Sequence, residues 1–253
     1  MNVLLTQMLS KADPSQVPGL SRFFKTGPGQ YGEGDRFLGI KVPETRAVVK
    51  ECWRSVSFQD LEECIRSPYH EVRLAALLAL VEVFRHHKLR SSRRVAPQDD
   101  KGHAPEDVRQ RCVEFYLSHT EGINNWDLVD LSCYPLLGEW LLDKEDRSLL
   151  YNLATNGRTI WEQRIGIVST MTFIRNGQLK DTFEIADILL HHPHDLIHKA
   201  VGWLLREAGK RDKTALEAWL EPRASQMPRT MLRYAIEKFP EEERKRYLLE
   251  KSR

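Results

Sequence analysis

Apolar residues recur along most of the chain at the three- and four-residue spacing of an amphipathic helix. Two examples are the stretch of Val72, Ala76, Leu77 and Leu80 and the stretch of Ile165, Val168 and Met171. This spacing puts apolar side chains on one helical face, whereas the alternation typical of strands is nearly absent. The dipeptides Ser67-Pro68, His192-Pro193 and Met227-Pro228 each precede such a stretch, as expected where helices begin. The pattern predicts an all-α fold.

Four of these stretches place a basic residue ahead of an apolar run. They are EVRLAALLAL, EQRIGIVSTM, IHKAVGWLLR and MLRYAIEKF, and their basic residues are Arg73, Arg164, Lys199 and Arg233. Lys199 follows Arg164 by 35 positions, and Arg233 follows Lys199 by 34. The position 34 residues before Arg164 is Asp130, where the sign of the charge is reversed. Because a period in the thirties is typical of helical solenoids, we predict an α-solenoid of HEAT-like repeats with a concave basic groove.

Two segments interrupt this pattern. The polar stretch at about 90–107 predicts an exposed loop that joins two repeats. The alternative is that the arginines of this stretch contact phosphate. The segment 27–39 holds five glycines but lacks the GK[ST] ending of a nucleotide-binding loop. The other interpretation of this segment is a turn that brings its backbone amides close to a DNA phosphate. We otherwise expect a single HEAT-like repeat domain over residues 1–253.

Composition and charge narrow the class of protein only slightly. The chain has 253 residues with 38 basic and 36 acidic side chains, and a net charge of +2 does not by itself indicate a nucleic-acid partner. No apolar run approaches the ~20 residues that span a bilayer, and the first nine residues do not resemble a signal peptide. The four cysteines lie inside apolar helical patterns without CxxC spacing, which predicts buried thiols. We therefore expect a cytoplasmic protein.

One helix, predicted over residues 125–137, carries candidate chemistry. Trp126 and Asp130 lie four positions apart and share a face of this helix. A lone carboxylate within a basic stripe repels phosphate, but it suits glycosidic hydrolysis, in which positive charge builds on the sugar. Trp203 follows Lys199 by four positions, so the two tryptophans could offer electron-rich faces to a sugar or a cationic base. Arg164 would hold a phosphate and keep the acid ionised.

The same residues also have structural interpretations. The two tryptophans could be core residues, because aromatic side chains at helical spacing often are. Asp127 or Asp130 could cap a helix or form an ion pair with a neighbouring one, and the basic residues could form a ladder between repeats. His191, His192 and His194 are expected to form a solvated turn rather than a metal site.

Several motifs together resemble the HEAT-like-repeat alkylpurine DNA glycosylases of the AlkD type. They are RFLGIKVPETR, NNWDLVD, TIWEQRIGIV, IHKAVGWLLREAGK and MPRTMLRYAIEKF, in an order and at separations that match the family over most of the chain. The resemblance implies that Trp126, Asp130, Arg164 and Trp203 are the catalytic residues. The basic residues Arg73, Arg164, Lys199 and Arg233 are predicted to bind DNA.

The resemblance also implies an activity. Members of this family hydrolyse the N-glycosidic bond of N3- and N7-alkylated purines in duplex DNA, without rotating the damaged nucleotide into a pocket. The cationic base is already a good leaving group, so no general acid, metal or organic cofactor is implied. Such an enzyme needs no obligate protein partner and works as a monomer. The glycine-rich segment and the 90–107 stretch look like additions to the simplest family pattern. The alternatives are therefore a non-catalytic module that binds distorted or branched DNA and a protein-binding HEAT scaffold.

Overall fold

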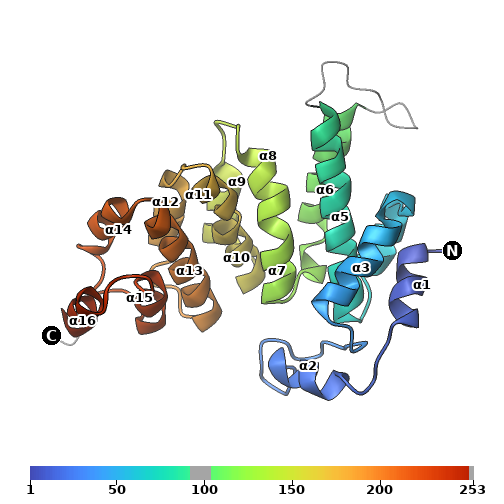
Figure 1. Ribbon diagram of the computed structural model, residues 1–253, viewed down its shortest axis with the longest axis horizontal. Coiled ribbons are helices and arrows are strands. Elements are labelled where there is room, and N and C mark those ends of the chain that lie inside the picture. The colour runs from blue at the N-terminus through green and yellow to red at the C-terminus, as the bar shows by residue number, and fades with distance from the viewer. Residues whose placement is uncertain (92–103, 251–253) are drawn as a thin grey trace. The chain divides into compact units, whose positions relative to one another are not determined.

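The computed structural model describes residues 1–91 and 104–250, and helices make up all the regular structure of these residues (Figure 1). The single pairing outside them is an isolated bridge between Arg36 and Tyr69. The prediction of an all-α chain is confirmed. Two compact units form, Met1–Ser132 and Cys133–Arg253. They are described separately as the N-terminal and the C-terminal unit, and the single domain expected over 1–253 stays a prediction.

The N-terminal unit is organised around one long buried helix, α5. Its helices are α1 (Val3–Ser10), α2 (Val17–Phe23), α3 (Val42–Cys52), α4 (Phe58–Ile65), α5 (His70–Ser91), α6 (Pro105–Ser118) and α7 (Trp126–Cys133), with short turns η1 (Trp53–Ser55) and η2 (Thr120–Gly122). Helix α5 packs against α1, α3, α4 and α6. Every residue from 70 to 81 is buried, so this helix has no solvent-facing stripe over three turns.

Helices cover both ends of the stretch at about 90–107 for which an exposed loop is predicted. Helix α5 continues through Ser91, because Lys88, Leu89 and Arg90 are good helix formers that extend an established helix. Helix α6 begins at Pro105, since proline is accommodated in the first turn, where its missing N–H has no partner to lose. The remaining part of that prediction, residues 92–103, lies outside the described residues.

The C-terminal unit is built from helices that pack on their sequence neighbours. They are η3 (Tyr134–Gly138), α8 (Glu139–Leu141), α9 (Ser148–Asn156), α10 (Ile160–Val168), α11 (Met171–Arg175), α12 (Lys180–Ile188), α13 (Asp195–Arg211), α14 (Lys213–Leu220), α15 (Arg229–Ala235) and α16 (Glu241–Glu250). Helix α13 is central and packs against α10, α12, α14 and α15 (Figure 1). This nearest-neighbour packing is the arrangement of a solenoid.

One glycine explains how closely α13 and α15 approach. A Cβ atom added at Gly202 would lie 2.5 Å from the Met231 carbonyl oxygen and 2.5 Å from the Tyr234 Cβ. The glycine of the KAVGW string therefore has a packing role: it lets the backbone of α15 lie directly against α13.

The helix predicted over residues 125–137 is not one continuous α-helix. Helix α7 ends at Cys133, and residues Tyr134–Gly138 form a π-helical turn. Pro135 has no N–H and cannot donate the α-helical hydrogen bond, so the backbone widens at this point.

The four cysteines are free and buried, as predicted. Burial raises the pKa of Cys64 to about 11 and that of Cys112 to about 12, so both stay as unreactive thiols. No helix within the described part of the chain is long and apolar enough to cross a membrane.

Candidate active site

The residues aligned by the repeat occupy equivalent positions in their helices. The fifth residue is Asp130 in α7, Arg164 in α10, Lys199 in α13 and Arg233 in α15, whereas Arg73 is the fourth residue of α5. In the C-terminal unit, α13 packs directly against both α10 and α15. The 34- to 35-residue period therefore corresponds to one recurring helix of each repeat.

Trp126 and Asp130 are both half-buried on α7. The indole of Trp126 stacks on Phe24, with ring centroids 5.6 Å apart, and meets Phe23 edge-on at 5.8 Å. Phe23 is 61% exposed, although it is a large apolar residue. Trp126 is thus neither a core residue nor an isolated surface residue, because one side of it is covered by the end of α2.

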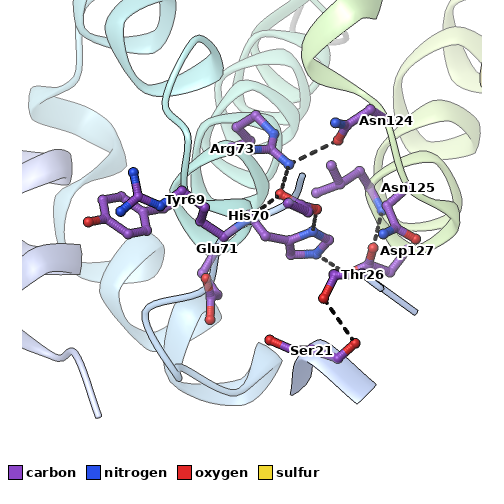
Figure 2. Close-up of polar contacts among 12 residues, drawn as sticks. Ser21, Thr26, Tyr69, His70, Glu71, Arg73, Asn124, Asn125 and Asp127 are labelled. Atoms are coloured by element: carbon purple, nitrogen blue, oxygen red, sulfur yellow. Dashed lines mark hydrogen bonds and ion pairs between the residues drawn. The ribbon is translucent and has the colours of Figure 1, made fainter. Parts of the chain in front are cut away.

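Arg73 lies inside the N-terminal unit and is only 5% exposed. Its guanidinium donates hydrogen bonds to the side chains of Asp35, at 2.7 Å, and Asn124, at 2.9 Å (Figure 2). It also donates to the Gly122 and Ser67 carbonyl oxygens. Through these four bonds, the guanidinium of Arg73 holds together chain segments that lie at helix ends. A DNA-binding role for Arg73 stays a prediction that these contacts do not favour.

The basic residues of the C-terminal unit differ in exposure. Arg164 is 5% exposed and donates to the Leu196 carbonyl oxygen in the first turn of α13. The ammonium of Lys199 pairs with Asp195 one turn earlier at 2.7 Å, and its side chain is 39% exposed. Arg233 is exposed on α15, and Trp203 is half-buried on α13. Arg233 and Lys199 thus have more access to solvent than Arg164.

A buried ionic bridge joins three segments of the N-terminal unit. The ring of His70, the first residue of α5, donates from Nδ1 to Asp35 at 2.8 Å and from Nε2 to Asp127 at 2.9 Å (Figure 2). Burial alone would lower the pKa of His70, but hydrogen bonds to Asp127 and Asp35 more than offset it and raise the pKa to about 9. The ring is therefore a cation at neutral pH.

Asp35 is the point where this bridge meets Arg73. Its burial acts to raise its pKa, but the hydrogen bond from His70 and the charge of Arg73 outweigh this and hold the pKa below its usual value. The two carboxylates, the imidazolium and the guanidinium form a neutral group of buried charges. Asp127 therefore takes the ion-pair role that was one of its two interpretations.

The glycine-rich segment folds back onto the beginning of α7. A Cβ atom at Gly32 would lie 2.4 Å from the Phe24 carbonyl oxygen and 3.5 Å from Asn125 Nδ2. Asn125 is fully buried at the N-terminus of α7, and its Nδ2 has no hydrogen-bond partner within the part of the chain that the structure describes. No nucleotide-binding loop forms here, because α2 precedes the segment instead of a strand.

A third buried carboxylate, that of Glu71, explains the RFLGI motif. Both oxygens of Glu71 accept backbone N–H groups, from Leu38 and Gly39 at 2.9 Å and from Ile40 at 3.1 Å. Gly39 has a φ of 90°, and a Cβ there would lie 1.9 Å from the Asp13 carbonyl oxygen. The motif therefore anchors the end of the glycine-rich segment to the start of α5.

The histidine-rich turn before α13 is more ordered than a solvated turn. His192 Nδ1 accepts the His194 backbone N–H, and His194 Nδ1 accepts that of Leu196 and caps the helix. Burial lowers the pKa of both rings, so they remain neutral acceptors. Among the described residues, no three His, Cys, Asp or Glu side chains come together in a way that could hold a metal ion.

Sequence reasoning missed Asp35 and His70. Nothing in the spacing pairs Asp35 with a histidine 35 positions later or with Asp127 a further 57 positions on. The one local signal is their polarity: each sits beside an apolar run, at the end of a glycine-rich turn or at the start of a buried helix. Burial of such a group requires a charged or hydrogen-bonding partner.

Comparison with known proteins identifies the family. The family model of DNA alkylation repair enzymes matches residues 4–239. A solved structure, described as a predicted DNA alkylation repair enzyme from Enterococcus faecalis, has the same fold with a TM-score of 0.64 and 15% sequence identity, over 91% of this chain and 97% of that one. None of the curated proteins matches the chain. The chain therefore belongs to the family of DNA alkylation repair enzymes.

Proposed function

We propose that this protein is a monofunctional DNA glycosylase that hydrolyses the N-glycosidic bond of N3- and N7-alkylated purines in duplex DNA. The observation that carries the proposal is Asp130, a half-buried carboxylate on α7. It stands at the helix position that carries basic residues in α10, α13 and α15. A carboxylate weakens phosphate binding at such a position, so a catalytic use accounts for it better than DNA affinity does.

The chemistry requires one stabilising charge. An alkylated purine already carries positive charge and leaves without protonation, so the sugar becomes oxocarbenium-like as the bond breaks. Asp130 would stabilise that sugar and orient the attacking water, while the partly exposed face of Trp126 would contact the deoxyribose. Roles for Arg164 and Trp203 in catalysis, and for Lys199 and Arg233 in DNA binding, remain predictions from the resemblance.

The direct test is release of free methylated base from methylated duplex DNA by the purified protein. We expect release of 7-methylguanine or 3-methyladenine well above spontaneous depurination, with an abasic site left in an unbroken strand. Spontaneous loss must be subtracted, because N7-methylguanine leaves slowly without an enzyme. Release at the background rate would refute the glycosylase proposal.

A second candidate is a non-catalytic module that binds distorted or branched DNA. The observation that favours it is the end of α2, where Phe23 and Phe24 contact Trp126 and cover one side of it. Salt-sensitive binding to duplex or branched DNA, without base release, would support this function. A protein-binding scaffold would show neither DNA binding nor base release. In both DNA-binding cases we expect a monomeric, cytoplasmic protein.

A further inference from the structure

The bridge through His70 connects the glycine-rich turn to the helix that carries the proposed catalytic residues. His70 is 1% exposed, and each of its ring nitrogens faces a carboxylate oxygen. Two carboxylate acceptors require two N–H donors, so the ring must carry both protons to satisfy them. The remaining oxygen of Asp127 accepts the Leu128 backbone N–H at 2.9 Å, which fixes the carboxylate to the first turn of α7.

A set of aromatic contacts extends from His70 to Trp126. Phe24 and Phe37 both pack against the imidazolium, with centroid distances of 4.6 and 4.9 Å. Phe24 then stacks on Trp126 at 5.6 Å. A cation against aromatic faces adds an electrostatic attraction to their packing. Trp126 is thus held through its neighbour Asp127 and through Phe24, and both contact His70.

Few other contacts hold α2 beside Trp126. None of the seven residues of α2 is buried. An apolar pocket of about 250 Å³ lies next to it, and its walls include Leu20, Phe23, Ile40 and Leu74. Helix α2 is therefore incompletely packed, and anchors that follow it in the chain carry much of its attachment. These anchors are Phe24 and the residues from Asp35 to Ile40.

We propose that His70 is a positioning residue for Trp126. By joining Asp35 of the glycine-rich turn to Asp127 at the start of α7, it sets the orientation of the tryptophan that contacts the alkylated nucleotide. This inference rests on the proposed function for its catalytic consequence, but the orientation of Trp126 can be measured without any reaction. Because His70 is buried, it would act on the reaction only through its neighbours.

Removal of the ring charge leaves the buried carboxylates of Asp35 and Asp127 without the cation that lies between them. They repel each other in a medium of low dielectric constant, so the turn and the start of α7 should move apart. A displacement of about 1 Å at a substrate-contacting group can reduce a rate about a hundredfold. We therefore expect His70→Gln, which can donate to one carboxylate but lacks the charge, to reduce excision about tenfold to a hundredfold. DNA affinity should change much less.

The experiment labels the protein with 5-fluorotryptophan and records its ¹⁹F spectrum. The chain has six tryptophans, and the resonance of Trp126 is assigned from its absence in Trp126→Phe. In His70→Gln and in Asp35→Asn, the Trp126 resonance should shift or broaden while the other five keep their positions. Single-turnover excision and DNA affinity are measured at 25 °C on the same samples.

Asp181→Asn is the matched control. Asp181 forms a comparable partly buried ion pair with Arg147 at 2.6 Å, and both residues belong to the C-terminal unit. This variant should lose stability but keep the excision rate per folded molecule and the Trp126 resonance. The comparison separates positioning from a general loss of stability.

The two measurements distinguish failure of this inference from failure of the proposed function. An inactive parent protein would refute the glycosylase proposal, while the ¹⁹F spectra would still decide the positioning role. A His70→Gln variant with an unchanged Trp126 resonance overturns the inference, whatever the activity. A variant that excises as fast as an active parent overturns it as well.

Discussion

Asp130 is the residue on which the proposed chemistry depends. Replacement by Asn keeps its size and part of its hydrogen bonding but removes the charge. Excision should fall by about two orders of magnitude, the scale of losing one electrostatic stabiliser. DNA affinity should hold or rise slightly, since a charge that repels phosphate has gone. Single-turnover base release and a binding titration measure the two effects separately.

The control for this change is Glu121→Gln. Glu121 is an exposed carboxylate in the turn η2 that precedes α7, and its replacement removes the same charge. It should leave the excision rate unchanged. If the Asp130 and Glu121 variants behaved alike, net charge rather than a positioned carboxylate would determine the rate.

His70 should make the stability of the N-terminal unit depend on pH. Its pKa is about 9 in the folded chain and 6.5 in the absence of its partners. A raised pKa means that the folded state binds the proton more tightly. The stabilisation is therefore complete below pH 6.5 and is lost as the pH rises through about 9. The free energy of unfolding should decrease over this range by about 3 kcal/mol relative to a chain without the bridge.

Chemical denaturation between pH 6 and pH 10 measures this dependence, with His70→Gln as the reference. The variant should be less stable than the parent at neutral pH, and its curve should be flatter on the alkaline side. Parallel curves for the two proteins would mean that His70 does not carry the proton in the folded state.

At the scale of helices, the contact between α13 and α15 depends on Gly202. Alanine at this position would bring its Cβ within 2.5 Å of the Met231 carbonyl oxygen, which belongs to the backbone and cannot rotate away. Although alanine favours a helix more than glycine does, the overlap should destabilise the protein by about 1–3 kcal/mol. Thermal and urea unfolding test the size of the loss.

Gly19→Ala is the matched control for that substitution. Gly19 lies inside α2, and a Cβ there has no atom within 4 Å. Stability should stay the same or rise by up to about 1 kcal/mol, because alanine restricts the unfolded chain. A loss at Gly19 equal to that at Gly202 would argue against the close helix contact.

At the scale of the whole molecule, DNA affinity must come from basic residues at particular positions, because the net charge is only +2. Binding to duplex DNA should weaken as salt increases, since phosphate contacts release counterions. Arg233→Gln on α15 should reduce the slope of log affinity against log salt by about one. Lys180→Gln, which removes an exposed charge from α12, should not change that slope.

A slope near zero in the parent would favour the protein-binding scaffold over both DNA-binding functions. Equal effects of the two variants would mean that any exposed cation contributes, and that the position of Arg233 in the repeat has no special role.

Much of the architecture could be predicted from the sequence, because it depends on local periodicity. The three-to-four spacing of apolar residues determines helices, and the Pro dipeptides indicate where α5, α13 and α15 begin. The period of the basic residues identified one recurring helix of each repeat, with Asp130 and Arg164 at the same position in α7 and α10. These features need only the chain itself and its nearest turns.

The tertiary structure decided which polar residues are used internally. Arg73 and Arg164 have the same sequence signature as Arg233, yet the first two are buried and hydrogen-bonded within the fold. Whether a side chain at a given helix position faces solvent depends on what packs above it, and periodicity does not contain that information. For the same reason, the bridge of Asp35, His70 and Asp127 could not be predicted. Buried charges must find partners, and partners distant in sequence meet only once the chain has folded.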